Sequence, residues 1–336
     1  MVFVTGGTGF LGAHILVELT GRGHKIRALY RNEDKIKNVE VLFRYFFKED
    51  AADRFNQIEW VVGDILDVVS LENGMQGCHS VYHAAAMVSF RKRDFKQLMK
   101  INKEGTANVV NVALDKGLKD FCHVSSTAAV GKSTEKDVQE ESNKWVKKSS
   151  TSNYAVSKYS AENEVWRGRE EGLNVVIVNP SVIFGAGDCN EGSLSIFKVV
   201  KKGLKFYTTG ANAFVDARDV AYVLCELHKQ KIYNERFLVF SENRSYRSVF
   251  NQIAAEFKVK PPSIETKKWM ASIAWRLEGV LAFLFGKKQN ITKETATSAM
   301  TKTVFSNEKI KSEIGMEFIP VDQSIKDTVA YLQSGK

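Results

Sequence analysis

The sequence predicts an α/β protein, built on a doubly wound parallel sheet with a smaller, mainly helical C-terminal part. Three observations support this prediction. Short apolar runs alternate with helical patterns through the first half, the runs are apolar on both faces, and a glycine-rich turn follows the first of them. Strands that alternate with helices form βαβ units, whose strands are parallel and covered on both sides. A chain of 336 residues suffices for one large domain or two domains in close contact.

Six strands are expected in the first half of the chain. They are Val2–Thr5, Lys25–Tyr30, Ile58–Val62, Ser80–His83, Asp120–Val124 and Asn174–Val178. Phe214–Val220 is interpreted as a link back into the sheet and Arg236–Phe240 as a late strand, whereas the chain after about residue 245 is mainly helical. Ser133–Asn153 is polar and is expected to form a long surface loop or a short helix.

Composition narrows the classes of protein to consider. The formal net charge is +9, but lysine and arginine are spread along the chain and no base-reading module is visible, so no nucleic-acid partner is expected. Four cysteines occur without a CxxC pair, which argues against a disulfide scaffold and a metal site. The N-terminus enters a strand directly, with no signal-peptide pattern, and we therefore expect a cytoplasmic protein.

One apolar segment, Trp269–Phe285, needs separate treatment. It is followed by Lys287 and Lys288 and carries Arg276 and Glu278 near its centre. A membrane span needs about 20 apolar residues, and charges at its centre are costly. We therefore favour a helix of the C-terminal part, while a weak contact of residues 269–288 with a membrane surface, or a dimer face, stays open.

The glycine-rich turn Thr5–Gly12 has the spacing of a dinucleotide-binding loop. Gly6, Gly9 and Gly12 form GxxGxxG between the first strand and the first helix. Glycine allows the backbone to turn sharply and to approach a pyrophosphate, while the helix N-terminus offers free N–H groups to the phosphates. The residues expected to contact the cofactor are Gly6, Thr8, Gly9, Phe10, Leu11 and Gly12.

The end of the second strand selects the cofactor. A site for NAD(H) usually carries Asp or Glu there, about 20 residues after the glycines, to hold the ribose 2′-hydroxyl. This chain has Arg31 and no acid at the strand end. A guanidinium can form a bidentate pair with a 2′-phosphate, so the sequence favours NADP(H) over NAD(H).

Two further strand ends are expected to border the cofactor. Asp64 and Ile65 follow the third strand, where an acidic side chain can accept the amino hydrogens of adenine, although an ordinary turn is the alternative. Ala84 and Ala85 follow the fourth strand, and their small side chains would let the cofactor lie close to the backbone.

Tyr154 and Lys158 are the candidate catalytic pair. Of the ten tyrosines, Tyr154 alone has a lysine four residues later, and this spacing places both side chains on one face of a helix. A nearby ammonium is expected to lower the pKa of the phenol and make it a useful acid or base. Lys158 can also reach the ribose hydroxyls of the cofactor. A solvent-facing helical pair is the alternative interpretation.

These motifs together resemble the extended short-chain dehydrogenases/reductases, and most closely the branch of dihydroflavonol reductase, cinnamoyl-CoA reductase and 3β-hydroxysteroid dehydrogenase. The resemblance covers nearly the whole chain. It rests on Thr5–Gly12, Asp64-Ile65, Tyr82–Ala85, Asn102, Ser125-Ser126, Tyr154 with Lys158, Asn179-Pro180, Phe214–Ala221 and the Ser-Asn-Glu-Lys run that starts at Ser306.

The resemblance implies roles for several residues. Ser126 would polarise the substrate oxygen, with Thr127 as a rival because some relatives carry that hydroxyl one position later. Pro180 would lie by the nicotinamide amide and Asn102 near the active-site helix. Many sugar-modifying relatives have a tyrosine where this chain has Gly131, which slightly weakens a sugar substrate.

The expected activity is reversible hydride transfer between NADPH and an aldehyde or ketone. Residues 181–213 and 241–336 are rich in Phe, Trp and Leu and are expected to form the substrate domain, which favours an apolar or aromatic substrate. Residues 1–180, with 214–240 returning to them, would bind the cofactor. The alternatives are a nucleotide-sugar epimerase or dehydratase with bound NAD, and a non-catalytic NADPH-binding regulatory protein. A homodimer is a further hypothesis.

Overall fold

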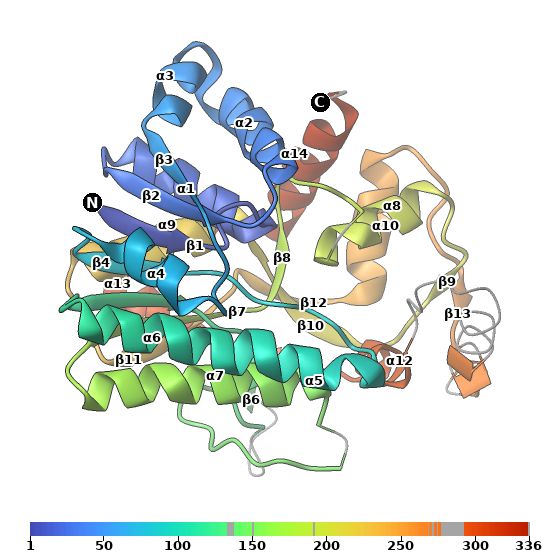
Figure 1. The fold of residues 1–336 in the computed structure, drawn as a ribbon. Coiled ribbons are helices and arrows are strands. Elements are labelled where there is room, and N and C mark those ends of the chain that lie inside the picture. Colours follow the sequence, from blue (N-terminus) through green and yellow to red (C-terminus); the bar gives the residue numbers. More distant parts are fainter. Residues whose placement is uncertain are drawn as a thin grey trace.

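The computed structural model describes residues 1–132, 138–149, 151–190, 192–267, 269–270, 272–273, 275–276 and 292–334. A parallel sheet of seven strands lies at its centre, in the order β11-β7-β5-β4-β1-β2-β3 (Figure 1). The strands are β1 (Val2–Thr5), β2 (Ile26–Tyr30), β3 (Ile58–Val62), β4 (Ser80–His83), β5 (Asp120–Val124), β7 (Asn174–Pro180) and β11 (Glu235–Val239). The order reverses between β1 and β4, which is the switch point of a Rossmann fold.

This sheet confirms the predicted fold class. Four of the six early strands have the expected bounds, while β2 begins one residue later than predicted, at Ile26, and β7 continues to Pro180. The late strand is shifted by one residue, to Glu235–Val239, and Phe214–Val220 divides into the end of a strand and the start of a helix. Within 138–149 and 151–152, the polar segment forms a two-residue strand, β6 (Val138–Gln139), and loops.

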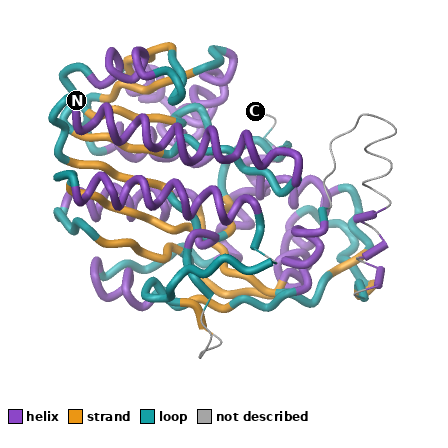
Figure 2. Tube along the Cα trace, turned by 60° about the horizontal axis from the view of Figure 1, so that its bottom comes forward, coloured by secondary structure: helices purple, strands orange, loops and turns teal. Residues whose placement is uncertain are grey.

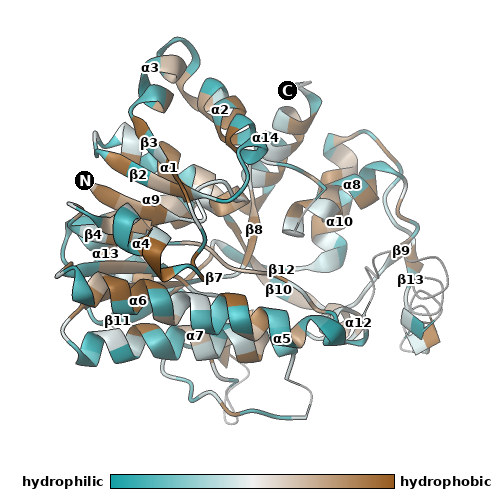
Figure 3. Cartoon of the chain, viewed as in Figure 1, coloured by the Kyte–Doolittle hydropathy of each residue, from teal (hydrophilic) through white to brown (hydrophobic). Residues whose placement is uncertain are grey.

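Helices cover both faces of the sheet and bury a separate apolar core on each. One core includes α1 (Phe10–Gly21), α2 (Asp34–Phe47), α3 (Ala51–Asn56), α9 (Ala217–Lys229) and α13 (Glu308–Ile314). The other includes α4 (Val68–Met75), α6 (Gly105–Asp115) and α7 (Asn153–Glu170). Helices α6 and α7 lie side by side along their face, and the strands between the layers are strongly hydrophobic (Figures 2 and 3). Short α5 (Phe95–Leu98) and a π-helical turn, Met99–Glu104, lead into α6.

A third core lies beyond the carboxyl ends of the strands. It joins α8 (Ser195–Lys201), α10 (Tyr246–Glu256) and α14 (Val321–Gln333) against a sheet of β8 (Val182–Phe184), β10 (Ala211–Asp216) and β12 (Glu242–Ser245). Smaller elements complete this side: β9 (Phe206–Tyr207) pairs with β13 (Ile264–Glu265), and β14 (Val304–Phe305) pairs with β6. Helix α12 is Lys293–Met300. The division of the chain into two domains stays a prediction.

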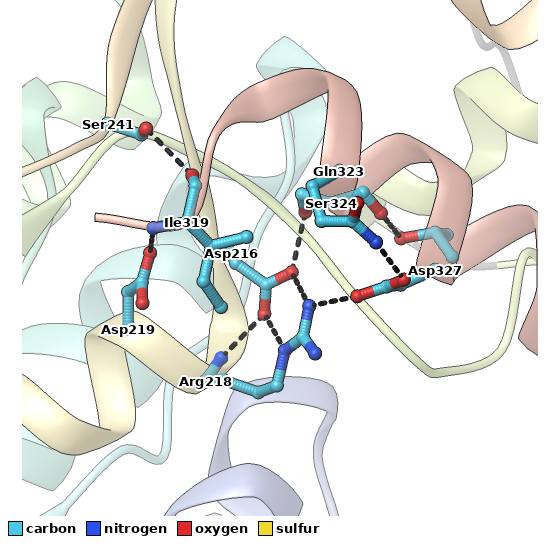
Figure 4. A network of polar contacts seen from close by, with 9 residues as sticks. Asp216, Arg218, Asp219, Ser241, Ile319, Gln323, Ser324 and Asp327 are labelled. Carbon is cyan, nitrogen blue, oxygen red and sulfur yellow. Dashed lines mark hydrogen bonds and ion pairs between the residues drawn. The ribbon is translucent and has the colours of Figure 1, made fainter. Parts of the chain in front are cut away.

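A polar cluster fixes the C-terminal helix to the strand that enters α9 (Figure 4). Asp216 is fully buried and pairs with Arg218 at 2.9 Å, while Arg218 reaches Asp327 of α14 at 2.7 Å. The Ser324 hydroxyl donates to Asp216 at 2.6 Å, and Asp219 accepts from the Ile319 N–H at 2.9 Å. Because these contacts join residues about a hundred positions apart, they decide where α14 lies.

The apolar segment at 269–285 is described only in part. Trp269 and Ile273 are exposed, by 62% and 48%, and residues 277–288 lie outside the described residues. Among the helices that the structure describes, none has the length and apolar character needed to cross a membrane.

Candidate active site

A large cleft opens at the carboxyl ends of the central strands. Its volume of about 3470 Å³ exceeds the 300–1,000 Å³ or so of an ordinary ligand pocket, so it has room for a dinucleotide and a substrate together. Nearly all the predicted site residues line it. They are Gly6, Thr8, Gly9, Phe10, Leu11, Gly12, Arg31, Ile65, Ala84, Ala85, Ser126, Thr127, Tyr154, Lys158 and Pro180.

The glycine loop leaves no room for a side chain at Gly6 or Gly12. A Cβ at Gly6 would lie 2.5 Å from the Ala85 nitrogen, and one at Gly12 would lie 2.0 Å from the Gly6 carbonyl oxygen. Gly6 also has φ of +74°, which side chains disfavour. The turn is closed by the Gly9 N–H, which donates to the Gly6 carbonyl at 2.9 Å. The backbone therefore forms a tight cradle against β4, as close approach to a pyrophosphate requires.

Helix α1 presents its N-terminus to this cradle. Its N-cap is Gly9, and no side chain caps the first turn. The N–H groups of that turn have no partner within the helix and carry a partial positive charge. An anionic pyrophosphate fits this position by both hydrogen bonding and charge.

Arg31 and Asp64 lie at the ends of adjacent strands, but only Arg31 is among the residues that line the cleft. The Arg31 guanidinium is 65% exposed and makes a long contact of 3.5 Å with Asp64, so it is not locked in place. Asp64 is absent from the lining of the cleft, where its neighbours Gly63 and Ile65 appear. Its carboxylate accepts the Leu66 N–H at 2.9 Å, which is the turn geometry weighed as the alternative.

Tyr154 lies in the first turn of α7, which begins after the N-cap Ser152. Its phenol and the Ser126 side chain line the same cleft and interact, so the structure brings the expected acid and the expected substrate-polarising hydroxyl together. Burial raises the pKa of Tyr154, and the interaction with Ser126 opposes this rise. The sequence-based expectation of a lowered pKa is therefore wrong for this structure, because desolvation of the phenolate outweighs the favourable contacts.

Lys158 lies one turn further along α7 and is almost fully buried, at 2% exposed. Its ammonium donates to the Val124 carbonyl oxygen at 2.9 Å, at the end of the strand that leads to Ser126. Desolvation lowers the pKa of Lys158 to about 8, while the charge of Glu162 favours the ammonium. The solvent-facing alternative for this pair is thus wrong, because Lys158 is buried and Tyr154 lines the cleft.

Asn102 links the active-site helix α7 to the loop at Met87. It lies in the π-helical turn and donates to the Ser157 hydroxyl at 2.9 Å, and Ser157 donates to the Tyr154 carbonyl at 2.8 Å. The same side chain accepts from the Met87 N–H at 2.7 Å and donates to the Met87 carbonyl at 3.0 Å. Asn102 therefore acts on Tyr154 through Ser157 and the helix backbone. It lies near the active-site helix, as the resemblance implied.

The two candidate hydroxyls after β5 differ in surroundings. Ser126 accepts from the Ala128 N–H at 3.2 Å and also contacts Tyr154, whereas Thr127 begins the short 3₁₀ turn and lines the cleft. Contact with the phenol favours Ser126 as the hydroxyl that holds a substrate oxygen.

The rest of the cleft wall was not identified from the sequence. Part of it comes from the loop around Phe90, whose ring centroid lies 5.4 Å from that of Tyr154. The remainder comes from the third core. Its apolar side chains include Val182, Ile196, Val199, Leu204, Phe206, Tyr246, Phe250 and Met270. No local motif marks these residues, because they meet only through the packing of α8, α10 and β9.

The comparisons with known proteins agree with this geometry. The model of the NAD dependent epimerase/dehydratase family matches residues 2–238. A provisionally named dihydroflavonol 4-reductase of Synechocystis sp. is 28% identical, over 99% of this chain and 94% of its own. Cinnamoyl-CoA reductase 1 of Petunia hybrida is 27% identical, over 99% and 92%. The crystal structure of gox2253 has a TM-score of 0.80 at 28% identity, covering 99% of this chain and 98% of the other.

The fold and the site thus define an extended short-chain dehydrogenase/reductase, an oxidoreductase enzyme that binds a nicotinamide dinucleotide. The chain belongs to the NAD-dependent epimerase/dehydratase family.

Proposed function

We propose that the enzyme is an NADPH-dependent reductase that transfers hydride to an aldehyde or ketone, reversibly with the alcohol. The observation that carries the proposal is that Tyr154, Ser126 and the buried Lys158 line the same cleft as the glycine cradle, with Lys158 bonded to the end of the strand that leads to Ser126. The reductase names of relatives aligned over 99% of this chain support the same conclusion.

Ser126, Tyr154 and Lys158 have different roles in the proposed reaction. Ser126 holds the carbonyl oxygen of the substrate, and Tyr154 donates its phenolic proton to that oxygen. An ordinary phenol has a pKa of about 10 and is protonated at neutral pH, so Tyr154 can serve as the proton donor. Lys158 holds the ribose and stabilises the phenolate that is left. The nicotinamide, when bound, supplies the hydride in reduction and accepts it in oxidation.

Arg31 supports NADPH over NADH in this proposal. Its exposed guanidinium at the end of β2 lines the cleft and has no acidic neighbour closer than 3.5 Å among the ion pairs of the described residues. A 2′-phosphate can displace such a long contact and form a charge-assisted pair. An apolar or aromatic substrate is favoured by the hydrophobic wall that includes Phe90, Phe206 and Phe250.

The test is NADPH oxidation with a panel of aldehydes, aromatic ketones and steroids. Turnover of any member should fall by about 10²- to 10⁴-fold in Tyr154→Phe, which removes the acid. Tyr159→Phe is the matched control, because Tyr159 lies on the same helix as Tyr154 but is not among the residues that line the cleft. A Tyr154→Phe enzyme with full activity would refute the assignment. Conversion of UDP- or dTDP-sugars without net loss of NADPH would instead identify an epimerase or dehydratase.

A further inference from the structure

Glu162 is a buried carboxylate that the reaction above does not use. It lies on α7 four residues after Lys158 and is 1% exposed. A buried carboxylate is stable only when it is paired and hydrogen-bonded, so its surroundings indicate what it does.

Four donors converge on this carboxylate. The Ser125 hydroxyl donates at 2.5 Å and the Asn179 amide at 2.8 Å, both to Oε2. The Arg236 guanidinium donates at 3.0 Å and the Trp166 indole N–H at 3.3 Å, both to Oε1. All four partners donate and both oxygens accept, which is the pattern of an ionised carboxylate.

These partners are neighbours of the reacting groups. Ser125 precedes Ser126 at the end of β5, and Asn179 precedes Pro180 in β7. Asn179 also donates to the Ser126 carbonyl at 3.0 Å. Glu162 therefore clamps the two strand ends that carry the predicted substrate hydroxyl and the predicted nicotinamide contact.

Glu162 also supplies the charge that faces Lys158. Tyr154 lies one turn before Lys158 on α7, and the other titratable groups whose charges interact with this ammonium among the described residues include Glu162 on α7, His83 on β4 and His123 on β5. Burial lowers the pKa of His83 to about 3 and that of His123 well below its usual value, so both rings are neutral near pH 7. The favourable charge on Lys158 thus comes from Glu162.

We propose that Glu162 is a positioning residue of the active site: its carboxylate fixes the ends of β5 and β7, and its negative charge lies one helical turn from Lys158, which binds the cofactor ribose. Arg236, on β11, positions Glu162 in turn and is itself held by the Glu141 carbonyl at 3.0 Å. The inference rests on the proposed role of Lys158 in cofactor binding.

The experiment measures dinucleotide affinity against pH, between about pH 6 and pH 10, by fluorescence titration with NADPH and, in parallel, NADH. Affinity should fall as Lys158 loses its proton, with a midpoint near pH 8 in the unaltered enzyme. Glu162→Gln should lower this midpoint by about one pH unit, because the ammonium loses its favourable charge. Arg236→Gln, which breaks the same ion pair but keeps the carboxylate, should not lower it.

Two further variants serve as a substitute, in case Glu162→Gln does not fold, and as a control. Glu162→Gln with Arg236→Leu removes the buried carboxylate together with its partly buried partner charge, which is often well tolerated, and should show the same lowered midpoint if the single variant does not fold. Glu164→Gln, on the same helix beside Arg167, should leave the midpoint unchanged. An unshifted midpoint in both Glu162 variants, or equal shifts in Glu162→Gln and Arg236→Gln, would overturn the inference. Binding of NADH without NADPH would instead break the cofactor proposal and leave this test intact.

Discussion

The two sides of the cleft are built in different ways. On the cofactor side, backbone atoms and small residues from neighbouring strand ends form the surface, and a Cβ added at Gly12 has only 2.0 Å to the nearest oxygen. On the substrate side, large apolar side chains from α8, β9 and α10 form the wall, and several are partly exposed. The first surface is fixed by backbone geometry and the second by side-chain packing.

This difference teaches how each side should respond to change. A surface made of backbone cannot move aside for an extra atom, so its function should fail abruptly. A wall of side chains loses contacts one at a time, so its function should change in steps of about 1 kcal/mol. The following variants test that contrast, from the largest expected effect to the smallest.

Gly12→Ala should weaken dinucleotide binding by about 100-fold or more. The added methyl forces the backbone of the Gly6 turn to shift, which costs about 1–3 kcal/mol and also displaces the N–H groups expected to face the phosphates. Isothermal titration with NADPH measures the effect. Gly21→Ala is the control, since a Cβ there meets nothing within 4 Å, and it should bind normally. Equal affinities for the two variants would contradict the rigid-cradle account.

Arg31→Ala should raise the Kd for NADPH by about 10- to 100-fold, because a hydrogen bond to a charged group contributes about 1.5–3 kcal/mol. The Kd for NADH should change by less than about twofold. Arg44→Ala serves as the comparison, because this exposed arginine pairs with Glu40 on α2 and is not among the residues that line the cleft. Parallel losses for both nucleotides in Arg31→Ala would show that Arg31 does not select the 2′-phosphate.

Asp219→Asn tests the contact between α9 and the chain segment that leads into α14, where the Asp219 carboxylate accepts the Ile319 N–H. Burial raises the pKa of Asp219 to about 7, so the contribution of Asp219 to the free energy of unfolding is largest below the unfolded pKa of about 3.8 and falls as pH rises toward 7. Asparagine keeps an acceptor for the Ile319 N–H without the charge. In urea unfolding, the free energy of unfolding of the variant minus that of the unaltered protein should therefore increase by about 1–2 kcal/mol as pH rises from about 4 to 8. A constant difference across this range would mean that Asp219 is ionised throughout.

Phe206→Ser should raise KM for an apolar substrate about fivefold and leave the NADPH Kd unchanged, because it removes part of one hydrophobic contact. Ile264 is the matched control: it pairs with Phe206 between β13 and β9 and is exposed to the same degree, 45% against 44%, but it is not in the lining of the cleft. Ile264→Ser should leave both constants unchanged. A loss of cofactor affinity in Phe206→Ser would remove the distinction between the two sides.

Residues read from short motifs were placed most accurately. The glycine loop, Ser126, Tyr154 and Lys158 depend on spacing within one turn or at one strand end, and they meet in one cleft. Asp64 was harder to place, because the same residue suits an adenine contact and a turn; its bond to the Leu66 N–H shows the turn, and the adenine contact stays a prediction. The direction of the pKa of Tyr154 was predicted wrongly, since spacing reveals a nearby lysine but not the depth of burial.

The sequence by itself determined the parallel sheet, the dinucleotide loop and the catalytic helix, because each depends on residues close together in the chain. Tertiary structure alone decided the substrate wall, the position of α14 and the carboxylate clamp at Glu162. Glu162 draws its partners from β5, β7, β11 and its own helix. Such contacts leave no periodic pattern in the sequence, since they form only where packed elements bring distant residues into one low-dielectric space.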